Sequence, residues 1–347
     1  MIKEKKNTLT WTQLEFRLAL IIFVALACVP LIIKQPYLIH IFIMALLYAY
    51  VAQCWNLLGG VAGQFSIGHI MYFGVGAYAA IFLFTKMSIS PWIGMVFAGI
   101  MAAILGLFVS FLGLRYGLKG DYYALFTLAL SQMLKLIVTN IKTLGGAMGI
   151  YIPLKGFSLV NMQFRTKIAY FYIALVMVVV ITFIVYRIIT TRIGMYFVAL
   201  RENESAAEAL GVDTTRYKTI ATIISAVFTG MGGTLFAMYT MYIDPEITFG
   251  LGPNFEFILM AIIGGKGSLL GPVVGSLILK PLAEFTRAIF GGGRPGVFLM
   301  IYGALLATVI LFLPNGLMGL LQRSYRQLSV SKQKVINQGI QEIDTTR

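Results

Sequence analysis

Long apolar stretches separated by short polar segments dominate this sequence. A membrane-spanning helix needs about 20 apolar residues, and ten stretches approach that length: 18–33, 40–58, 70–84, 91–114, 122–138, 168–189, 217–243, 249–264, 269–290 and 296–317. Their apolar residues are continuous rather than alternating, which predicts helices and not a membrane barrel. Glycines interrupt the shorter stretches 70–84 and 249–264. We therefore expect an all-α, polytopic helical membrane protein with 8–10 transmembrane helices and glycine-broken segments.

The first stretch has some features of a cleaved signal peptide, because basic residues precede it and small residues precede Cys28. Its polar lead is long, however, and the apolar run continues past Cys28 to residue 33. An uncleaved first span is the better interpretation. We expect a cytoplasmic segment at 1–17, a transmembrane domain at 18–318 and a cytoplasmic tail at 319–347.

Composition agrees with a membrane protein and limits the class of partner. The chain is 59% hydrophobic and 12% charged, whereas a soluble domain is about 25% charged. The net charge of +14 comes largely from basic residues in the polar segments, which predicts that both termini and the loop 190–216 are cytoplasmic. Both termini on one side require an even number of spans. No basic segment alternates with stacking aromatic residues, so we expect the lipid bilayer and no nucleic acid as a partner. The basic residues include Lys3, Lys5, Lys6, Arg192, Arg201, Arg216, Lys218, Arg323, Arg326, Lys332 and Lys334.

Two short motifs imitate nucleotide-binding loops. Residues 74–79 match the dinucleotide fingerprint but lie inside an apolar stretch without the strand that the fingerprint needs. Residues 264–268 resemble a phosphate loop, but Gly267 follows the lysine where Ser or Thr would bind magnesium. The two cysteines and two histidines have no metal-ligand spacing. We expect no ATPase site, no cofactor, no metal and no enzymatic activity in this chain.

The most informative polar segment, 190–213, predicts a short exposed helix. Asn203 or Ser205 is suited to cap it, and Gly211 is placed to end it. Such a helix of about two turns is not stable alone in water, which favours docking on a partner over an ordinary loop helix. Its small side chains are Ala206, Ala207 and Ala209.

Residues 205–211 resemble the EAA loop by which permeases of bacterial ABC importers contact their ATPase subunits. The leading Glu of that loop is replaced by Ser205, with Glu204 beside it. Across about 40–318 the chain is similar to the LivM-type permease of branched-chain amino-acid importers, apart from Asn254, where a small hydroxyl residue is expected. The stretches that carry this resemblance are 56–69, 73–78, 114–115, 120–124, 127–128, 145–149, 244–245 and 262–275.

The resemblance implies a permease subunit that moves branched-chain amino acids into a bacterial or archaeal cytoplasm by alternating access. Related permeases carry other amino acids, urea or short amides, so the solute stays open. The implied partners are a second homologous permease, two ABC ATPase subunits that consume ATP, and an external substrate-binding protein. The alternatives are a secondary transporter or channel, and a structural or assembly subunit. The implied ATPase-coupling residues are Arg201, Glu204, Ser205, Ala206, Ala207 and Gly211.

Glycines interrupt the apolar runs in both halves of the chain, a pattern that points to a substrate path. Several recur every four residues, which favours close helix packing. Polar residues near the first interruption either satisfy hydrogen bonds between helices or line the path, and Glu256 has either a structural role or a substrate contact. The packing or hinge glycines are Gly59, Gly60, Gly63, Gly264, Gly265, Gly267, Gly271 and Gly275, and the path candidates are Asn56, Gln64, Ser66, His69 and Glu256.

Overall fold

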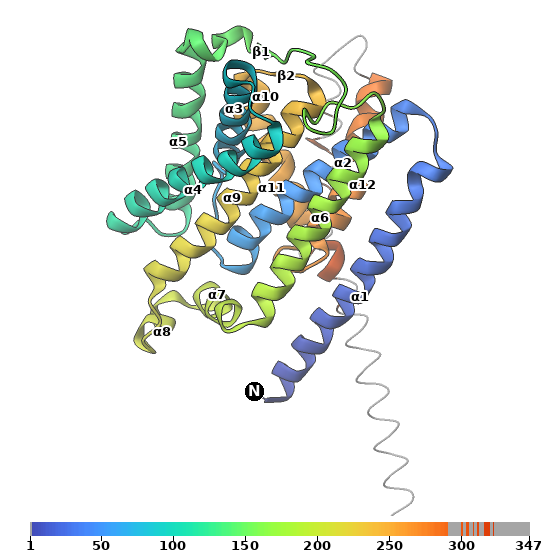
Figure 1. Cartoon of the computed structure of the whole chain (residues 1–347). Helices are drawn as coiled ribbons and strands as arrows, with labels where there is room; N and C mark the ends of the chain where they lie inside the picture. The colour runs from blue at the N-terminus through green and yellow to red at the C-terminus, as the bar shows by residue number, and fades with distance from the viewer. Residues whose placement is uncertain are drawn as a thin grey trace, which may run out of the picture.

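The computed structural model describes residues 2–290 and, beyond them, 300, 303–304, 308, 311, 316–319 and 322; the N-terminal side chains are described from residue 13. It is a bundle of long helices (Figure 1). The long helices are α1 (Ile2–Ile32), α2 (Pro36–Trp55), α3 (Ile70–Met87), α4 (Pro91–Arg115), α5 (Asp121–Asn140), α6 (Lys167–Thr190), α9 (Thr214–Thr240), α11 (Leu251–Gly265) and α12 (Gly271–Phe290). The shorter elements are α7 (Arg192–Glu202), α8 (Glu204–Ala209), α10 (Pro245–Phe249), η1 (Asn56–Val61), η2 (Lys142–Leu144), η3 (Gly146–Met148), β1 (Ile150–Tyr151) and β2 (Tyr242–Ile243).

Eight segments in the described part of the chain are long and apolar enough to cross a membrane. This confirms the polytopic helical class. Helix α12 has the length of a span but carries three charged residues, Lys280, Glu284 and Arg287. The expected span 296–317 lies largely outside the described residues, and the expected tail 319–347 lies almost entirely outside them. The eight segments are Gln13–Ile32, Pro36–Val61, Ile70–Met87, Pro91–Arg115, Asp121–Asn140, Lys167–Thr190, Thr214–Thr240 and Pro245–Gly265.

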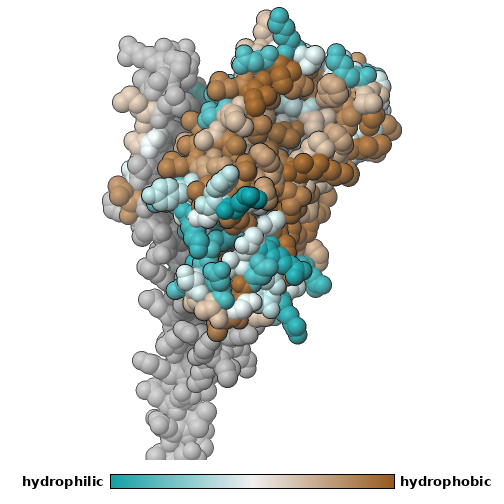
Figure 2. Space-filling view, turned by 90° about the vertical axis from the view of Figure 1, so that its left-hand side faces the viewer, coloured by the Kyte–Doolittle hydropathy of each residue, from teal (hydrophilic) through white to brown (hydrophobic). Residues whose placement is uncertain are grey.

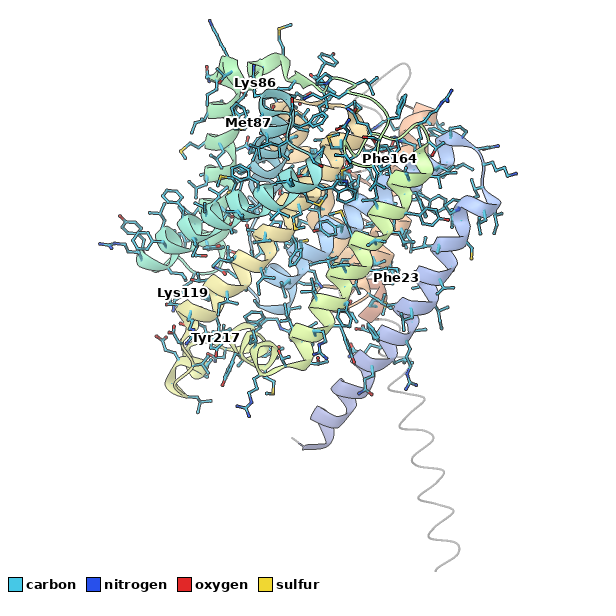
Figure 3. The ribbon with its side chains drawn as sticks, viewed as in Figure 1. Phe23, Lys86, Met87, Lys119, Phe164 and Tyr217 are labelled. Atoms are coloured by element: carbon cyan, nitrogen blue, oxygen red, sulfur yellow. The ribbon has the colours of Figure 1, made fainter. Side chains whose placement is uncertain are left out.

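The bundle has two distinct ends (Figure 1). Helices α7 and α8 lie at the same end as the N-terminus of α1, and β1, β2 and α10 lie at the other. Figure 2 shows an apolar surface across the middle and upper part of the bundle, with a few hydrophilic side chains at the second end and more of them gathered toward the first. Figure 3 places Lys119 and Tyr217 at the first end and Lys86 and Met87 at the second, so basic residues occur at both ends.

Helix α2 lies inside the bundle, with 78% of its span buried, whereas the corresponding figure for α1 is 28%. Helix α1 packs against α6 through Phe16 and Tyr186, whose ring centroids are 4.3 Å apart. The main-chain N–H of Leu269 donates to the Glu15 carboxylate over 3.0 Å. Helix α1 thus already contacts the rest of the bundle at residues 15 and 16, before the expected boundary at residue 17, while the cytoplasmic location of 1–17 stays a prediction.

Two small β features interrupt the all-helical architecture in the described residues: a two-residue ladder and an isolated bridge between Ser158 and Gln163. Strands β1 and β2 pair antiparallel, with Ile150 opposite Ile243 and Tyr151 opposite Tyr242. The ladder joins the long connection after α5 to the end of α9. It pins the connection across that end of the bundle without changing the fold class.

Candidate coupling site and glycine breaks

The first glycine break lies between α2 and α3. After Trp55 the helix widens into the π-helical turn η1, which contains Gly59 and Gly60, and the chain at 62–69 is non-helical before α3 begins. The indole of Trp55 donates to the carbonyl of Ser66 over 2.8 Å. Thr127 of α5 accepts a hydrogen bond from the N–H of Gly68 over 3.3 Å. We call 56–69 the first break.

The second break is the turn between α11 and α12, residues 265–271. Here the two helices touch through main-chain atoms. A Cβ on Gly264 would lie 1.8 Å from the carbonyl oxygen of Gly271, and one on Gly275 would lie 2.1 Å from that of Met260. Only glycine permits backbones to approach this closely.

The two breaks are bound to each other. The side chain of Asn56 accepts from the N–H of Gly267 over 2.8 Å and donates to the carbonyl of Ser268 over 2.9 Å. Gln53 donates to the carbonyl of Leu269 over 3.0 Å. Asn56 thus replaces, for the turn, the main-chain partners that a continuous helix would have supplied.

Asn254, where a small hydroxyl residue was expected, connects α11 to the residues at the end of the first break. From α11 its Oδ1 accepts the N–H of Ile70 over 3.1 Å, and its amide donates to the carbonyl of Ile67. The side chain is fully buried. A small hydroxyl has fewer hydrogen-bonding groups than this amide. Sequence reasoning flagged Asn254 but missed its role as an anchor of the first break.

Helix α8 has the caps that its sequence predicts. The side chain of Asn203 accepts the N–H of Ala206 over 3.0 Å, so Asn203 rather than Ser205 is the N-cap. At the other end Val212 donates to Ala207 over 3.0 Å and Gly211 to Glu208 over 2.9 Å. These two bonds form a Schellman motif, which requires the positive φ of 85° that Gly211 adopts. The six-residue helix is shorter than the two turns expected.

The exposed face of α8 differs from the expected one. Ala207 is 3% exposed and faces the interior of the bundle, so its expected place on the exposed docking face is wrong. Ser205, Ala206 and Ala209 are exposed, and Leu210 is 85% exposed. Alanines occur on both sides of α8, so their pattern in the sequence does not show which side packs against the bundle.

Glu204 forms ion pairs within this chain. Its carboxylate lies 2.7 Å from Lys218 at the start of α9 and 3.3 Å from Lys119 in the turn after α4. Partial burial opposes ionisation, but hydrogen bonds and charge from the two lysines outweigh it and hold the pKa of Glu204 below its ordinary value. Glu204 therefore ties α8 to the bundle.

Arg201, in the last turn of α7, lies against both breaks. Its guanidinium donates to the carbonyl of Gly60 over 3.3 Å and pairs with Glu202 over 2.8 Å. A Cβ on Gly63 would lie 2.8 Å from the Cα of Arg201, and one on Gly267 would lie 2.8 Å from its Nη1. Arg201 thus connects α7 to residues of both breaks.

The family model for the permease component of branched-chain amino-acid transport systems matches residues 37–311. The chain belongs to this family. It is 27% identical to the high-affinity branched-chain amino acid transport system permease protein LivM of Salmonella typhimurium, over 79% of this chain and 68% of that protein. It is 28% identical to the probable branched-chain amino acid transport permease protein LivM of Methanocaldococcus jannaschii, over 78% of this chain and 86% of that protein.

A shorter similarity connects this permease to a LivH protein. The LivH permease of Escherichia coli is 30% identical over 37% of this chain and 40% of its own. No solved structure matches the chain significantly. The resemblance inferred from short motifs is confirmed, with this chain on the LivM side.

Most of the expected path residues have partners inside the permease. Gln64 accepts a hydrogen bond from Thr222 over 3.3 Å, and His69 Nε2 lies 2.8 Å from the hydroxyl of Thr229. Ser66 Oγ and His69 Nδ1 lack a hydrogen-bond partner in the described part of the chain. These contacts agree with the alternative that the polar residues satisfy hydrogen bonds between helices, while a role in the path stays a prediction.

Glu256 is the path candidate that the structure places in a charged environment. Its carboxylate lies 2.9 Å from the ammonium of Lys280, which is 3.3 Å from Glu284. Sequence reasoning missed Lys280, although its place in an apolar stretch nine residues after Gly271 was a usable signal. The described residues contain no group of His, Cys, Asp and Glu that could hold a metal.

Proposed function

We propose that this chain is the permease subunit of an ATP-driven importer of branched-chain amino acids. Separate ATPase subunits supply the energy, a second homologous permease completes the path, and an external binding protein delivers the solute. The observation that supports this most strongly is the contact of Arg201 with both glycine breaks, in a chain of the branched-chain amino-acid permease family. Through Arg201, the loop 190–216 is in direct contact with the glycine breaks inside the bundle.

In this proposal α8 docks on an ATPase subunit, and α7 transmits the resulting movement to the breaks. Ser205, Ala206, Ala209 and Leu210 offer a small, partly apolar face to an ATPase groove. Glu204 and Ala207 hold α8 to the bundle, so a force on the exposed face moves α7 rather than only α8. Arg201 then shifts the first break relative to the second. The end with α7 and α8 is cytoplasmic, in keeping with Arg192, Arg201 and Arg216 in that loop.

The test is transport by the complete complex, reconstituted with its ATPase subunits in proteoliposomes. Uptake of radiolabelled leucine, isoleucine and valine should require both ATP and the binding protein. Uptake that proceeds without ATPase subunits, driven by a sodium or proton gradient, would assign the chain to secondary transport. Normal uptake by a complex that lacks this chain would make it an assembly subunit.

The docking face has its own test. Ala209→Arg places a large charge on the exposed side of α8 and should weaken ATPase association at least tenfold in pull-downs, with normal membrane insertion. Thr215→Arg is the matched control, since Thr215 is exposed at the same end but outside α8. Equal association of both variants would remove α8 from the docking surface.

A further inference from the structure

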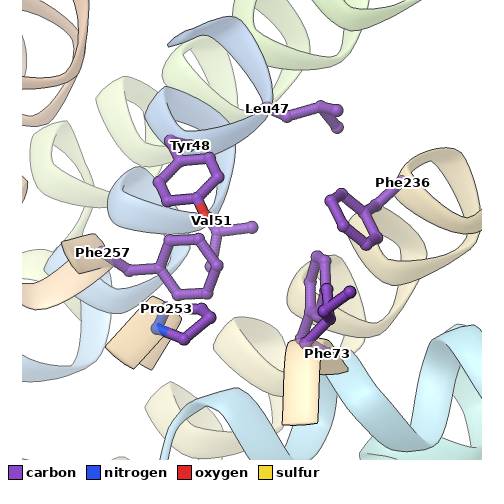
Figure 4. Close-up of a pocket in the computed structure, with 8 residues that line it drawn as sticks. Leu47, Tyr48, Val51, Phe73, Phe236, Pro253 and Phe257 are labelled. Carbon is purple, nitrogen blue, oxygen red and sulfur yellow. The ribbon is translucent and has the colours of Figure 1, made fainter. Parts of the chain in front are cut away.

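A connecting segment without regular helix or strand, 153–165, crosses the end of the bundle opposite α7 and α8, from the ladder to α6 (Figure 1). Inside the bundle, apolar side chains face one another, as Phe73, Phe236 and Phe257 do around the small pocket in Figure 4. The connecting segment instead exposes four apolar side chains to between 62% and 71%: Leu154, Phe157, Leu159 and Val160. An exposed apolar patch of this kind marks contact with another protein or with a membrane.

Hydrogen bonds hold the connecting segment on the ends of α3 and α4. The indole of Trp92 donates to the carbonyl of Leu159 over 2.7 Å. The ammonium of Lys155 donates to the carbonyl of Phe84 over 2.7 Å and to the hydroxyl of Ser88 over 2.9 Å. Because these bonds fix the segment, the fold itself keeps the four apolar side chains on the surface.

The two helices next to the connecting segment, α4 and α6, carry exposed apolar stripes. The stripe of α4 runs from Ile93 to Phe111, and that of α6 from Ile168 to Phe183. Their residues recur every three or four positions, so each stripe occupies one face of its helix, and such a face on a membrane span contacts lipid. Both stripes begin beside the connecting segment. Its apolar side chains therefore extend the lipid-facing surface beyond the helix ends.

The polar side chains beside this apolar surface are basic. The stretch 122–201 contains no Asp or Glu. Arg165 and Lys167 lie at the start of α6, and Lys167 donates to the carbonyl of Pro36 over 3.4 Å, which brings the turn with Lys34 alongside. No ion pair in the described part of the chain includes any of these three basic residues. Basic residues at a membrane surface are attracted to anionic headgroups, so an anionic lipid surface fits them.

We propose that the connecting segment is seated in the interface of the bilayer and binds anionic phospholipids. The four apolar side chains enter the boundary between headgroups and acyl chains, and Lys34, Arg165 and Lys167 contact the phosphate groups. A soluble partner fits less well, because its departure would return four apolar side chains to water. The site requires neither solute nor ATP, so it stands apart from the import function.

The depth of the segment is tested with a nitroxide on Phe157→Cys of the full-length permease, in nanodiscs that contain phosphatidylglycerol. Cys28→Ser removes the exposed native thiol, while Cys54 is buried. The ratio of oxygen to water-soluble nickel-chelate accessibility should be at least threefold higher than at the control Thr143→Cys, which is exposed at the same end in the turn after α5. Equal ratios would overturn the proposal. Shielding of Phe157→Cys from the chelate only after the binding protein is added would also overturn it, in favour of a protein-docking surface.

The charges are tested by thermal unfolding of the full-length permease in detergent. Phosphatidylglycerol should raise the melting temperature more than phosphatidylcholine does, and the triple variant Lys34→Gln, Arg165→Gln and Lys167→Gln should lose about half of that difference or more. Lys142→Gln is the control, since Lys142 is exposed at the same end but lies before the ladder. The same lipid difference in the triple variant as in wild type would overturn the pairing with headgroups. If the triple variant fails to fold, the accessibility of Phe157→Cys decides.

Discussion

The first break contains an eight-residue non-helical stretch, 62–69, which side chains of α5 and α11 hold in place. The second contains only five non-helical residues, 266–270, and joins two helices that touch through main-chain atoms. Both read as glycine interruptions in the sequence. In the first, Gly63 leaves room for Arg201; in the second, Gly264 and Gly275 let α11 and α12 approach. The first break is therefore suited to move when α7 moves, and the second to serve as the rigid base to which Asn56 ties it.

The largest expected effect is at the second break. Gly264→Ala places a methyl group 1.8 Å from the carbonyl oxygen of Gly271, and neither helix backbone yields easily. We expect destabilisation of about 3 kcal/mol or more, at the upper end for overpacking, and loss of folded protein. Gly252→Ala on the same helix meets no atom within 4 Å and is the control. Thermal unfolding of the purified permease measures both, and equal melting temperatures would mean that α11 and α12 are not packed this closely.

A change in the first break should affect transport more than stability. Gln64→Leu and Thr222→Val each remove the hydrogen bond between these two side chains, about 1 kcal/mol, and Thr222→Val also removes the contact of the hydroxyl with the carbonyl of Lys218. If Gln64 lines the path, Gln64→Leu lowers leucine uptake several-fold while Thr222→Val lowers it less, with equal assembly of the complex. Equal uptake by the two variants would favour the purely structural role of Gln64.

The smallest expected effect is on the attachment of α8. Since the folded pKa of Glu204 is below its unfolded value of 4.5, the ion pairs with Lys218 and Lys119 contribute their stability above that value. The contribution is lost as the pH falls through the lower, folded pKa. Hydrogen exchange at 203–212 should therefore show loss of protection as the pH falls below 4.5, after correction for the intrinsic rate. Glu204→Gln should lack this transition, and a transition that persists in it would have to come from another group.

The sequence was sufficient for the class, the positions of most spans and both breaks, because these depend on apolar length and on glycine. It also predicted the caps of α8, which are local. It did not predict that Asn56 reaches Gly267 or that Asn254 reaches Ile70, because such contacts join residues about 200 positions apart. No spacing rule connects them.

Two other differences between the sequence prediction and the structure also arise from contacts between residues that are separated in the chain. The inward side of α8 depends on Lys119, which lies 85 positions before Glu204, and on Lys218 in the next helix, α9. The place of Lys280 in an apolar stretch was a usable signal, but its pairing with Glu256, 24 positions earlier, is seen only in the structure. Residues whose role depends on a distant partner were thus the ones missed.

The most direct test of the coupling account is the number of leucine molecules taken up per ATP hydrolysed by the complex with Arg201→Gln. The shortened, uncharged side chain loses its contact with Gly60 but leaves α8 and its docking face unchanged. The account predicts that ATPase association and hydrolysis persist, while this ratio falls at least fivefold relative to wild type and to the control Arg192→Gln, whose arginine is exposed at the start of α7. A wild-type ratio in the Arg201→Gln complex would contradict it.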